Sequence, residues 1–335
     1  MLDFSVIIPV YNGMAAGLPR CLDSVWEQPV DTGRYEVICV DDCSTDGTLA
    51  WLGEQQAEHA NLRVLTNQAN LRQGGGRNRG MREARGRYIV FLDQDDYLHE
   101  GSLLEAMRCL GDGDLEVLVV DNSREVPGKP SDEMYQCPAC RDVMAGDEFI
   151  ARGTVPFQPW NYVFLLSFAI ENEVYFVEHE PIEDVDWVYL LLHCAQRVQY
   201  QPILLVHNVI SASSTSMSSH IFHNIVYSHL RLSRRLQNLH DTRFQHSSTA
   251  TKEQVLQARE ITLYRGLRQL FFFGDKARIK AKNIRENAAG PSGAHQVPRL
   301  NRLARRHPVA FATISNLLSP LARRAMLVWR RYKYT

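Results

Sequence analysis

The sequence lacks an apolar run of the roughly 18 or more residues that a membrane-spanning helix needs. It also lacks the charged, apolar and small-residue order of a signal peptide, because Met1-Leu-Asp-Phe leads straight into an apolar strand pattern. From these two absences we expect a cytoplasmic protein. Hydrophobic residues make up 45% of the chain and charged residues 22%, the balance of an ordinary globular protein with a real core.

The sequence is also poor in paired cysteines. Its seven cysteines are odd in number and scattered, and several of them, such as Cys39 and Cys109, fall in apolar segments. This pattern favours reduced thiols that pack as small core residues. Cys137 and Cys140 form one close pair, but no second pair or spaced histidines accompany it, so we expect unpaired loop thiols rather than a zinc site.

Two common nucleotide-binding motifs are missing, although residues 74–76 are three consecutive glycines. The dinucleotide fingerprint requires a glycine where Arg79 stands, and the Gly-Lys-Ser or Gly-Lys-Thr of the phosphate loop does not occur. A nicotinamide site and a P-loop are therefore excluded. Glycines that open a helix, with Arg77 and Asn78, would still offer amides and a cation to a phosphate. Close packing of the helix on a sheet is the alternative, and both stay open.

What the sequence does contain is a regular alternation of strand and helix patterns. Strands are predicted at residues 4–10, 35–40, 62–66 and 88–92, and helices at 15–28, after 47 and from 74. This alternation predicts an α/β fold with a doubly wound, mostly parallel sheet, like the nucleotide-binding half of a Rossmann-like fold.

The later segments are less regular. The patterns predict a helix at 100–110, a strand at 115–120, an irregular insertion or flap at 121–145, and an aromatic helical segment at 157–170. Trp160 in that segment either packs in the core or stacks on a sugar. Beyond it we expect a strand at 198–207, a polar loop at 211–219, helices at 221–240, 252–273 and 308–332, and a linker at 287–293.

One apolar run ends in three carboxylates, Asp93, Asp95 and Asp96. Ligands bind outside the carboxyl ends of the strands in an open α/β sheet, so these acids would lie at the ligand-binding edge. Like charges repel there unless a cation joins them, and a divalent ion shared with a diphosphate would do so. Capping of a following helix is the alternative, and this stretch alone does not decide between them.

A second acidic cluster, Glu183, Asp184 and Asp186, follows a proline and precedes an apolar periodic run. It is therefore predicted at the N-terminus of a helix. Acids stabilise such a terminus through the helix dipole, and periodicity by itself favours this structural role. A carboxylate beside a deep site can also act as a general base.

The net charge of −1 hides an asymmetry. Residues 276–335 carry 14 Lys and Arg against one acid, Glu286, a net of +13 that leaves −14 for the rest. Such a tail predicts an anionic partner, and since no nucleic-acid recognition motif accompanies it we expect a membrane surface. Its helix at 308–332 either lies in the membrane interface or docks on the catalytic domain with its arginines solvated. The helical region is also a candidate surface for a homo-oligomer.

Four motifs occur in order, at residues 6–12, 40–48, 76–80 (with Asn70 before them) and 91–96. Together they resemble the inverting family 2 glycosyltransferases of GT-A fold, of the kind that builds bacterial surface polysaccharides. The resemblance is strong over 4–110, weaker over 160–215 and absent from the tail. It implies a nucleotide-sugar-binding half at 1–110, an acceptor-binding half at 111–218 and a helical basic region at 219–335.

The resemblance implies a nucleotide-diphosphate-sugar donor, with UDP as the nucleotide, on the first half of the sheet. The residues that match donor-binding positions are Pro9, Tyr11 and Asn12 at the nucleoside, Asp41 or Asp42 at the base or ribose, and Gly76, Arg77 and Gln94 beside the nucleotide. Asp93 and Asp95 match the D-x-D motif that holds the ribose and a Mn²⁺ or Mg²⁺, with Asp96 in support. Residues 72–76 depart from the family pattern, which leaves the contacts of that loop open.

Glu183 and Asp184 match the Glu-Asp pair of the family, which implies Asp184 as the base and Glu183 as its orienter. A hydroxyl of a glycan or lipid-linked acceptor would lose its proton to Asp184 and displace the nucleotide in one inverting step. A nucleotidyltransferase is one alternative, but it normally carries a basic Gly-rich loop where residues 11–14 stand. A catalytically silent sugar-nucleotide-binding protein is another, but it would be expected to lose an acid from one cluster.

Overall fold

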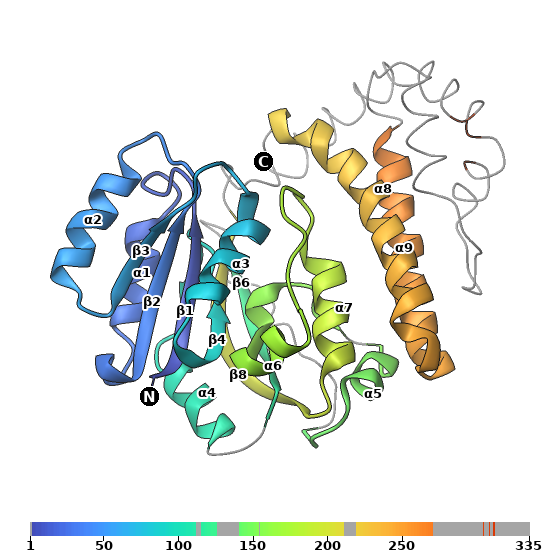
Figure 1. Ribbon diagram of the computed structural model, residues 1–335, viewed down its shortest axis with the longest axis horizontal. Coiled ribbons are helices and arrows are strands. Elements are labelled where there is room, and N and C mark those ends of the chain that lie inside the picture. Colours follow the sequence, from blue (N-terminus) through green and yellow to red (C-terminus); the bar gives the residue numbers. More distant parts are fainter. Residues whose placement is uncertain are drawn as a thin grey trace. The chain divides into compact units, whose positions relative to one another are not determined.

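The computed structural model describes residues 2–111, 115–125, 141–153, 155–210 and 219–270, together with residues 304, 308 and 311. The chain divides into two compact units, residues 1–217 and 218–335. The first unit is an α/β structure and the described part of the second is helical (Figure 1). The predicted division of the first unit into a donor-binding half, residues 1–110, and an acceptor-binding half, residues 111–218, stays a prediction.

The strands of the first unit form one eight-stranded sheet in the order β3-β2-β1-β4-β7-β6-β8-β5. The strands are β1 (Leu2–Val10), β2 (Tyr35–Asp41), β3 (Leu62–Thr66), β4 (Gly86–Phe91), β5 (Tyr97–Leu98), β6 (Val117–Glu125), β7 (Tyr162–Leu165) and β8 (Val198–Val209). Strands β1 to β4 are mutually parallel, as are β6 and β8, whereas β7 runs antiparallel to β4 and β6, and β5 antiparallel to β8. The predicted α/β fold with a mostly parallel sheet is confirmed.

Helices cover both faces of this sheet, which explains why its central strands are apolar without alternation. The helices are α1 (Leu18–Trp26), α2 (Thr48–Glu58), α3 (Arg72–Glu83), α4 (Ser102–Leu110), α5 (Gly146–Ala151), α6 (Leu166–Glu171) and α7 (Asp184–Cys194). Val6 and Ile8 of β1 belong to a core cluster with residues of α1 and α4, whereas Ile7 faces Gly80 of α3. Figure 1 shows α3 lying along the sheet beside β1 and β4.

The structure corrects three of the element predictions. Residues 162–165 form strand β7 at the middle of the sheet rather than helix, and α6 begins only at Leu166. Residues 121–125 continue strand β6 instead of opening an irregular insertion. Helix α1 begins at Leu18 rather than near residue 15, because Gly17 adopts a left-handed φ of 118° before it. Trp160 packs against the hydrophobic core, as the core alternative required.

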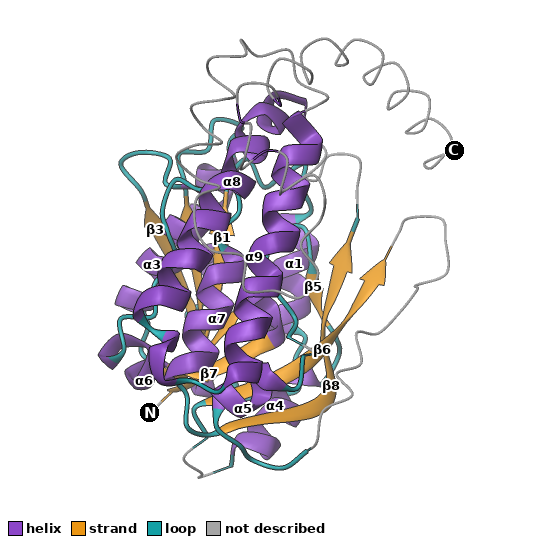
Figure 2. Ribbon diagram, turned by 90° about the vertical axis from the view of Figure 1, so that its right-hand side faces the viewer, coloured by secondary structure: helices purple, strands orange, loops and turns teal. Residues whose placement is uncertain are grey.

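The described part of the second unit is a helical hairpin. Helix α8 (Ser219–Thr242) and helix α9 (Thr249–Leu270) lie side by side, joined through the short 3-10 helix Phe244–His246 (Figure 2). Gly266 of α9 lies against Leu230 of α8, where an added Cβ would meet the Leu230 side chain at 2.9 Å. In the described ranges, no helix combines the length and apolar character needed to cross a bilayer. The predicted helix 308–332, the linker and the Cys137–Cys140 pair lie outside the described residues.

Candidate active site

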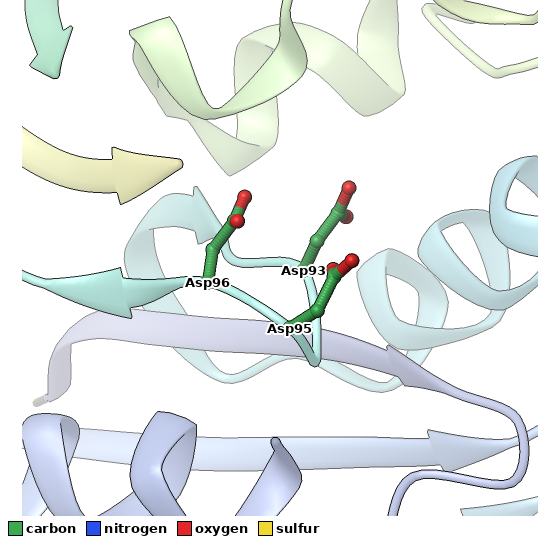
Figure 3. A group of neighbouring side chains, drawn as sticks. All are labelled: Asp93, Asp95 and Asp96. Carbon is green, nitrogen blue, oxygen red and sulfur yellow. The ribbon is translucent and has the colours of Figure 1, made fainter. Parts of the chain in front are cut away.

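The three carboxylates that follow β4 come together on one turn. Asp93, Asp95 and Asp96 each offer an oxygen within 4.8 Å of the others, and their carboxyl groups point to the same side of the turn (Figure 3). Asp93 and Asp96 are buried and Asp95 is half-buried. The next helix begins at Ser102 after Gly101, so none of the three acids caps it. The structure therefore excludes the capping alternative.

Crowding changes the acidity of this cluster. Burial, with the neighbouring Asp93 charge, raises the pKa of Asp95 to about 6. Burial, followed by the charges of Asp93 and Asp95, raises the pKa of Asp96 well above its ordinary value. Carboxylates held this close favour a cation between them, and a hard divalent ion is the cation that takes carboxylate oxygens.

Asp96 already has protein partners. The side-chain amide of Asn208 donates to its two oxygens at 3.1 and 3.0 Å, and the backbone N–H of Val209 donates to Oδ1 at 2.8 Å. Asp96 thus fastens the end of β8 to the acidic turn. Nothing in the sequence pattern singles out Asn208, which stands 112 residues from Asp96.

Arg77 joins the two acidic clusters. One terminal nitrogen of its guanidinium lies 2.7 Å from Asp93 Oδ1, and the other lies 2.7 Å from Glu183 Oε1. The side chain is 2% exposed. Burial works to lower the pKa of Arg77, but the charges of Asp93 and Glu183 outweigh burial and raise that pKa. The sequence placed Arg77 beside the nucleotide, and the structure places its charged end between the two clusters.

Helix α3 brings Arg77 to this place because it lies unusually close to the sheet. A Cβ added to Gly80 would stand 2.4 Å from Ile7 Cγ2, and one added to Gly76 would stand 3.0 Å from Pro9 Cβ. The amides of Leu71 and Arg72 at the start of α3 both donate to the Asp42 carboxylate at 2.8 Å. The glycines therefore serve close packing, and the helix start already holds an anion of the protein.

The two adjacent aspartates after β2 differ in how they are used. Besides those two amides, Asp42 accepts the side-chain N–H of Asn67 at 2.8 Å. Asp41 is buried and accepts one bond through Oδ2, from the backbone N–H of Ser44 at 3.1 Å. Its other oxygen, Oδ1, is buried without a hydrogen-bond partner among the residues described. Such an acceptor is costly to leave empty, so Asp41 is the one of the two that is free to accept from a ligand.

Among the residues predicted to bind the nucleoside at the end of β1, some hold the local backbone in place and one, Tyr11, is exposed. Asn12 adopts a left-handed φ of 49° and accepts the backbone N–H of Thr45 at 2.8 Å. The amide of Gln94 both accepts from and donates to the backbone of Tyr11, each at 2.9 Å. Pro9 is buried beneath α3. Tyr11 is 48% exposed, so it is the member of the group that presents a surface for stacking.

Helix α7 positions the second acidic cluster. Its Trp187 is buried in an aromatic group. The Trp187 ring stacks on the Phe176 ring with 4.4 Å between the ring centres, and it meets the Phe91 ring edge-on with 5.8 Å between the centres. Glu183 immediately precedes the helix and Asp184 is its first residue. Burial, and after it the Glu183 charge, raises the pKa of Asp184 to about 7. A carboxyl with a pKa near 7 is suited to exchange a proton at neutral pH.

Asn78 is a further supporting residue that the sequence did not assign. Its amide exchanges two hydrogen bonds with the backbone of Phe176, each 2.9 Å long, and thereby fastens the segment before α7 to α3. Asn78 stands next to Arg77 on the helix. The only sequence signal for it was its place in the glycine-rich motif.

Comparison with known proteins agrees with this arrangement. Residues 5–136 match the sequence model of the family described as Glycosyl transferase family 2. A poly(ribitol-phosphate) beta-glucosyltransferase of Bacillus spizizenii is 38% identical over 104 residues, which are 31% of this chain and 16% of that protein. The poly(ribitol-phosphate) beta-N-acetylglucosaminyltransferase TarS of Staphylococcus aureus is 34% identical over 132 residues, 38% of this chain and 23% of TarS. The chain thus matches less than a quarter of the length of these relatives.

Solved structures extend the likeness beyond the matched motif region. Residues 1–349 of S. aureus TarS in complex with UDP-GlcNAc superpose with a TM-score of 0.61 at 20% identity, covering 97% of this chain and 92% of that one. The mannosyltransferase PcManGT of Pyrobaculum calidifontis, in complex with GDP-Man and Mn²⁺, gives a TM-score of 0.54 at 15% identity, over 94% and 87% of the two chains. At these identities the structures show the fold, which is of the GT-A type. Residues 5–136 are therefore similar to family 2 glycosyltransferase domains, and the fold that contains them is shared with TarS and PcManGT.

Proposed function

We propose that the protein is an inverting glycosyltransferase that moves a sugar from a UDP-sugar to a hydroxyl of a glycan or lipid-linked acceptor. One observation carries the proposal. The Asp93-Asp95 cluster at the end of β4 and the Glu183-Asp184 pair at the start of α7 are joined through a single arginine. A metal-and-donor site and a base are thereby held in one network.

The donor nucleotide is assigned to the ends of β1 and β2. Asp41 offers a buried carboxylate oxygen without a described partner, which suits an N–H or O–H of the base or ribose. Tyr11, which follows β1, is an exposed residue on which the base could stack. UDP is favoured because the TarS structure contains UDP-GlcNAc. In this assignment Asp42, Asn12 and Gln94 shape the pocket through the bonds described above.

The acidic turn fits a divalent metal. Its donors are carboxylate oxygens of three residues within 4.8 Å of one another, the hard oxygen ligands that Mg²⁺ and Mn²⁺ prefer. Asp93 and Asp95 are the proposed ligands, because Asp96 is occupied by β8. When bound, the ion would neutralise the charge that develops on the departing diphosphate. Mn²⁺ accompanies GDP-Man in PcManGT, which favours the same class of ion here.

The base of the reaction is assigned to Asp184. An ionised Asp184 takes the proton of the acceptor hydroxyl, which attacks the anomeric carbon from the side opposite the nucleotide. Glu183 carries a negative charge that is held by Arg77 and raises the pKa of Asp184. Because one displacement completes the transfer, the mechanism needs no covalent intermediate on the enzyme and inverts the anomeric centre.

The acceptor is proposed to be a cell-surface glycan or its lipid-linked precursor. The names of the B. spizizenii and S. aureus relatives give poly(ribitol-phosphate) as their acceptor. The basic tail of this chain would suit an acceptor held at an anionic membrane surface. We accordingly propose peripheral association with the inner face of the plasma membrane.

The testing experiment is a screen of nucleotide-sugar turnover in the presence of Mn²⁺. UDP-sugars should be hydrolysed slowly by the wild type, since water replaces the acceptor hydroxyl. Asp95→Ala and Asp184→Ala should each abolish turnover, whereas Glu54→Ala, an exposed acid on α2, should leave it unchanged. Turnover that survives Asp184→Ala would remove the assignment of the base. If no sugar nucleotide is bound or turned over, the enzymatic proposal fails.

A further inference from the structure

We propose that Arg77 is a positioning residue that couples the donor and metal site to the base, and that it does so without touching the nucleotide. The inference rests on the proposed function of the two acidic clusters. Its starting observation is the pair of 2.7 Å contacts from one guanidinium, to Asp93 on one side and to Glu183 on the other. These partners stand 16 and 106 residues from Arg77 in the sequence.

The burial of Arg77 rules it out as an ordinary surface ligand for phosphate. Its side chain is 2% exposed, and those of Asp93 and Glu183 are 10% and 6% exposed. Its guanidinium carbon lies 5.2 Å from the ring centre of Phe176 and 5.8 Å from that of Phe91. A charge enclosed this way is stable only while its partners stay in place. Each terminal nitrogen already donates to a carboxylate, and the enclosure of the side chain limits the access of a nucleotide phosphate to it.

The backbone of Arg77 is held as firmly as its side chain. Gly76 packs on Pro9, and Gly80 packs on Ile7, both in strand β1. Asn78 fastens the segment that leads to α7 through its bonds to Phe176. Helix α3 is thus packed against β1 on one side and bonded to the segment before α7 on the other. The guanidinium of Arg77 therefore sets the distance between the carboxylates of Asp93 and Glu183.

The chemistry of the bridge requires arginine. A guanidinium is planar and presents its N–H groups in a rigid fork, so its two terminal nitrogens can hold two carboxylates at once in fixed directions. A lysine ammonium keeps the charge but has no such fork. Because both carboxylates share one cation, a change at either one alters the interaction available to the other, and this coupling must be reciprocal.

The test is a double-mutant cycle read by Mn²⁺ binding rather than by activity. The affinity for Mn²⁺ in the presence of UDP is measured by calorimetry for the wild type, Glu183→Gln, Arg77→Met and the double variant. We expect Glu183→Gln to change the Mn²⁺ affinity by at least about threefold, although Glu183 is no proposed ligand. In the Arg77→Met background the same substitution should have no further effect.

Control variants keep the test decisive. Arg79→Met removes an exposed arginine of the same helix, which pairs with Glu83 at the surface, and should behave as wild type. Should Arg77→Met not fold, Arg77→Lys replaces it in the cycle, and the effect of Glu183→Gln should shrink there as well. On turnover of the UDP-sugar that the screen identifies, Arg77→Lys should lower kcat more than it raises KM, because the lost bridge positions the base.

Two results would overturn the inference. One is an unchanged Mn²⁺ affinity in Glu183→Gln, and the other is an equal effect of that substitution with and without Arg77. Either result leaves the proposed function intact as long as the wild type binds Mn²⁺ and UDP. If the wild type binds neither, the proposed function fails first, and the coupling fails with it.

Discussion

At the scale of single residues, the half-buried Asp184 should control how the reaction depends on pH. Burial and the Glu183 charge raise the pKa of Asp184 to about 7, and a base acts only when ionised. The rate should therefore fall as pH drops below about 7, by about tenfold per pH unit, and should level off above it. The measurement is kcat/KM for turnover of the UDP-sugar that the screen identifies, between pH 5.5 and 8.5, values chosen to bracket the pKa of about 7.

Binding of Mn²⁺ provides the control for this profile. Burial raises the pKa of Asp95 to about 6 only, so Mn²⁺ and UDP binding should stay constant from about pH 7 upward and weaken below about pH 6. A rate that is flat across pH 7, or that follows the binding curve, would contradict the role of Asp184.

The neighbouring Asp41 and Asp42 should respond differently to the same substitution. Asp41→Asn alters an oxygen without a described protein partner, and should weaken UDP binding by about tenfold or more with little change in stability. Asp42→Asn disturbs a carboxylate that holds three donors, and should lower the free energy of unfolding. Calorimetry with UDP and urea denaturation separate the two effects. Equal losses of binding in both variants would contradict the division of roles.

At the scale of elements, the close approach of α3 to β1 should make Gly80 irreplaceable. A Cβ at Gly80 would stand 2.4 Å from Ile7 Cγ2, and overpacking of this kind costs about 1–3 kcal/mol of unfolding free energy. Gly53 on α2 is the matched control, because a Cβ there meets nothing within 4 Å, and alanine in an open helix position stabilises by up to about 1 kcal/mol. Urea denaturation of Gly80→Ala and Gly53→Ala checks both signs. Equal effects would show that helix propensity, not packing, governs Gly80.

Some of the strands could be predicted from the sequence and one could not. Strands β1 to β4 were predictable because each is a short run rich in apolar residues that is followed by polar or acidic residues, and the acidic turn followed from where β4 ends. Strand β7 was missed because it is buried on both faces and continues into a short helix, so neither period is visible over its four residues. For such a run, length and period do not separate helix from strand.

The contacts that organise the site could not be predicted from the sequence. Arg77 meets Glu183 across 106 residues, and Asp96 meets Asn208 across 112. Periodicity carries information over a few turns or strand residues, whereas these bonds depend on how α3, α7 and β8 pack on the sheet. The motif resemblance supplied the acidic residues and named Arg77 beside the nucleotide, but only the fold placed this arginine between the two acidic clusters.

At the scale of the whole molecule, the uneven charge predicts binding to anionic membranes. Residues 276–335 carry a net charge of +13, and basic residues near an anionic surface contribute about 1 kcal/mol each. The full chain should sediment with vesicles that contain phosphatidylserine and should be released by salt. Truncation after Asn287 should abolish this sedimentation. Vesicles of phosphatidylcholine alone are the control, and binding that survives the truncation would refute the membrane role of the tail.

The position of β7 has a consequence for synthesis on the ribosome. The four strands β3-β2-β1-β4 are complete when residue 91 has emerged, but the strand that pairs with the free edge of β4 begins at Tyr162, about 70 residues later. At roughly 5–20 residues per second that edge stays open for about 4–14 s. An open edge is a template for pairing with other chains. The nascent first half therefore exposes this edge for several seconds, and we expect its protection during that interval, as well as the final stability of the fold, to influence how much protein is obtained.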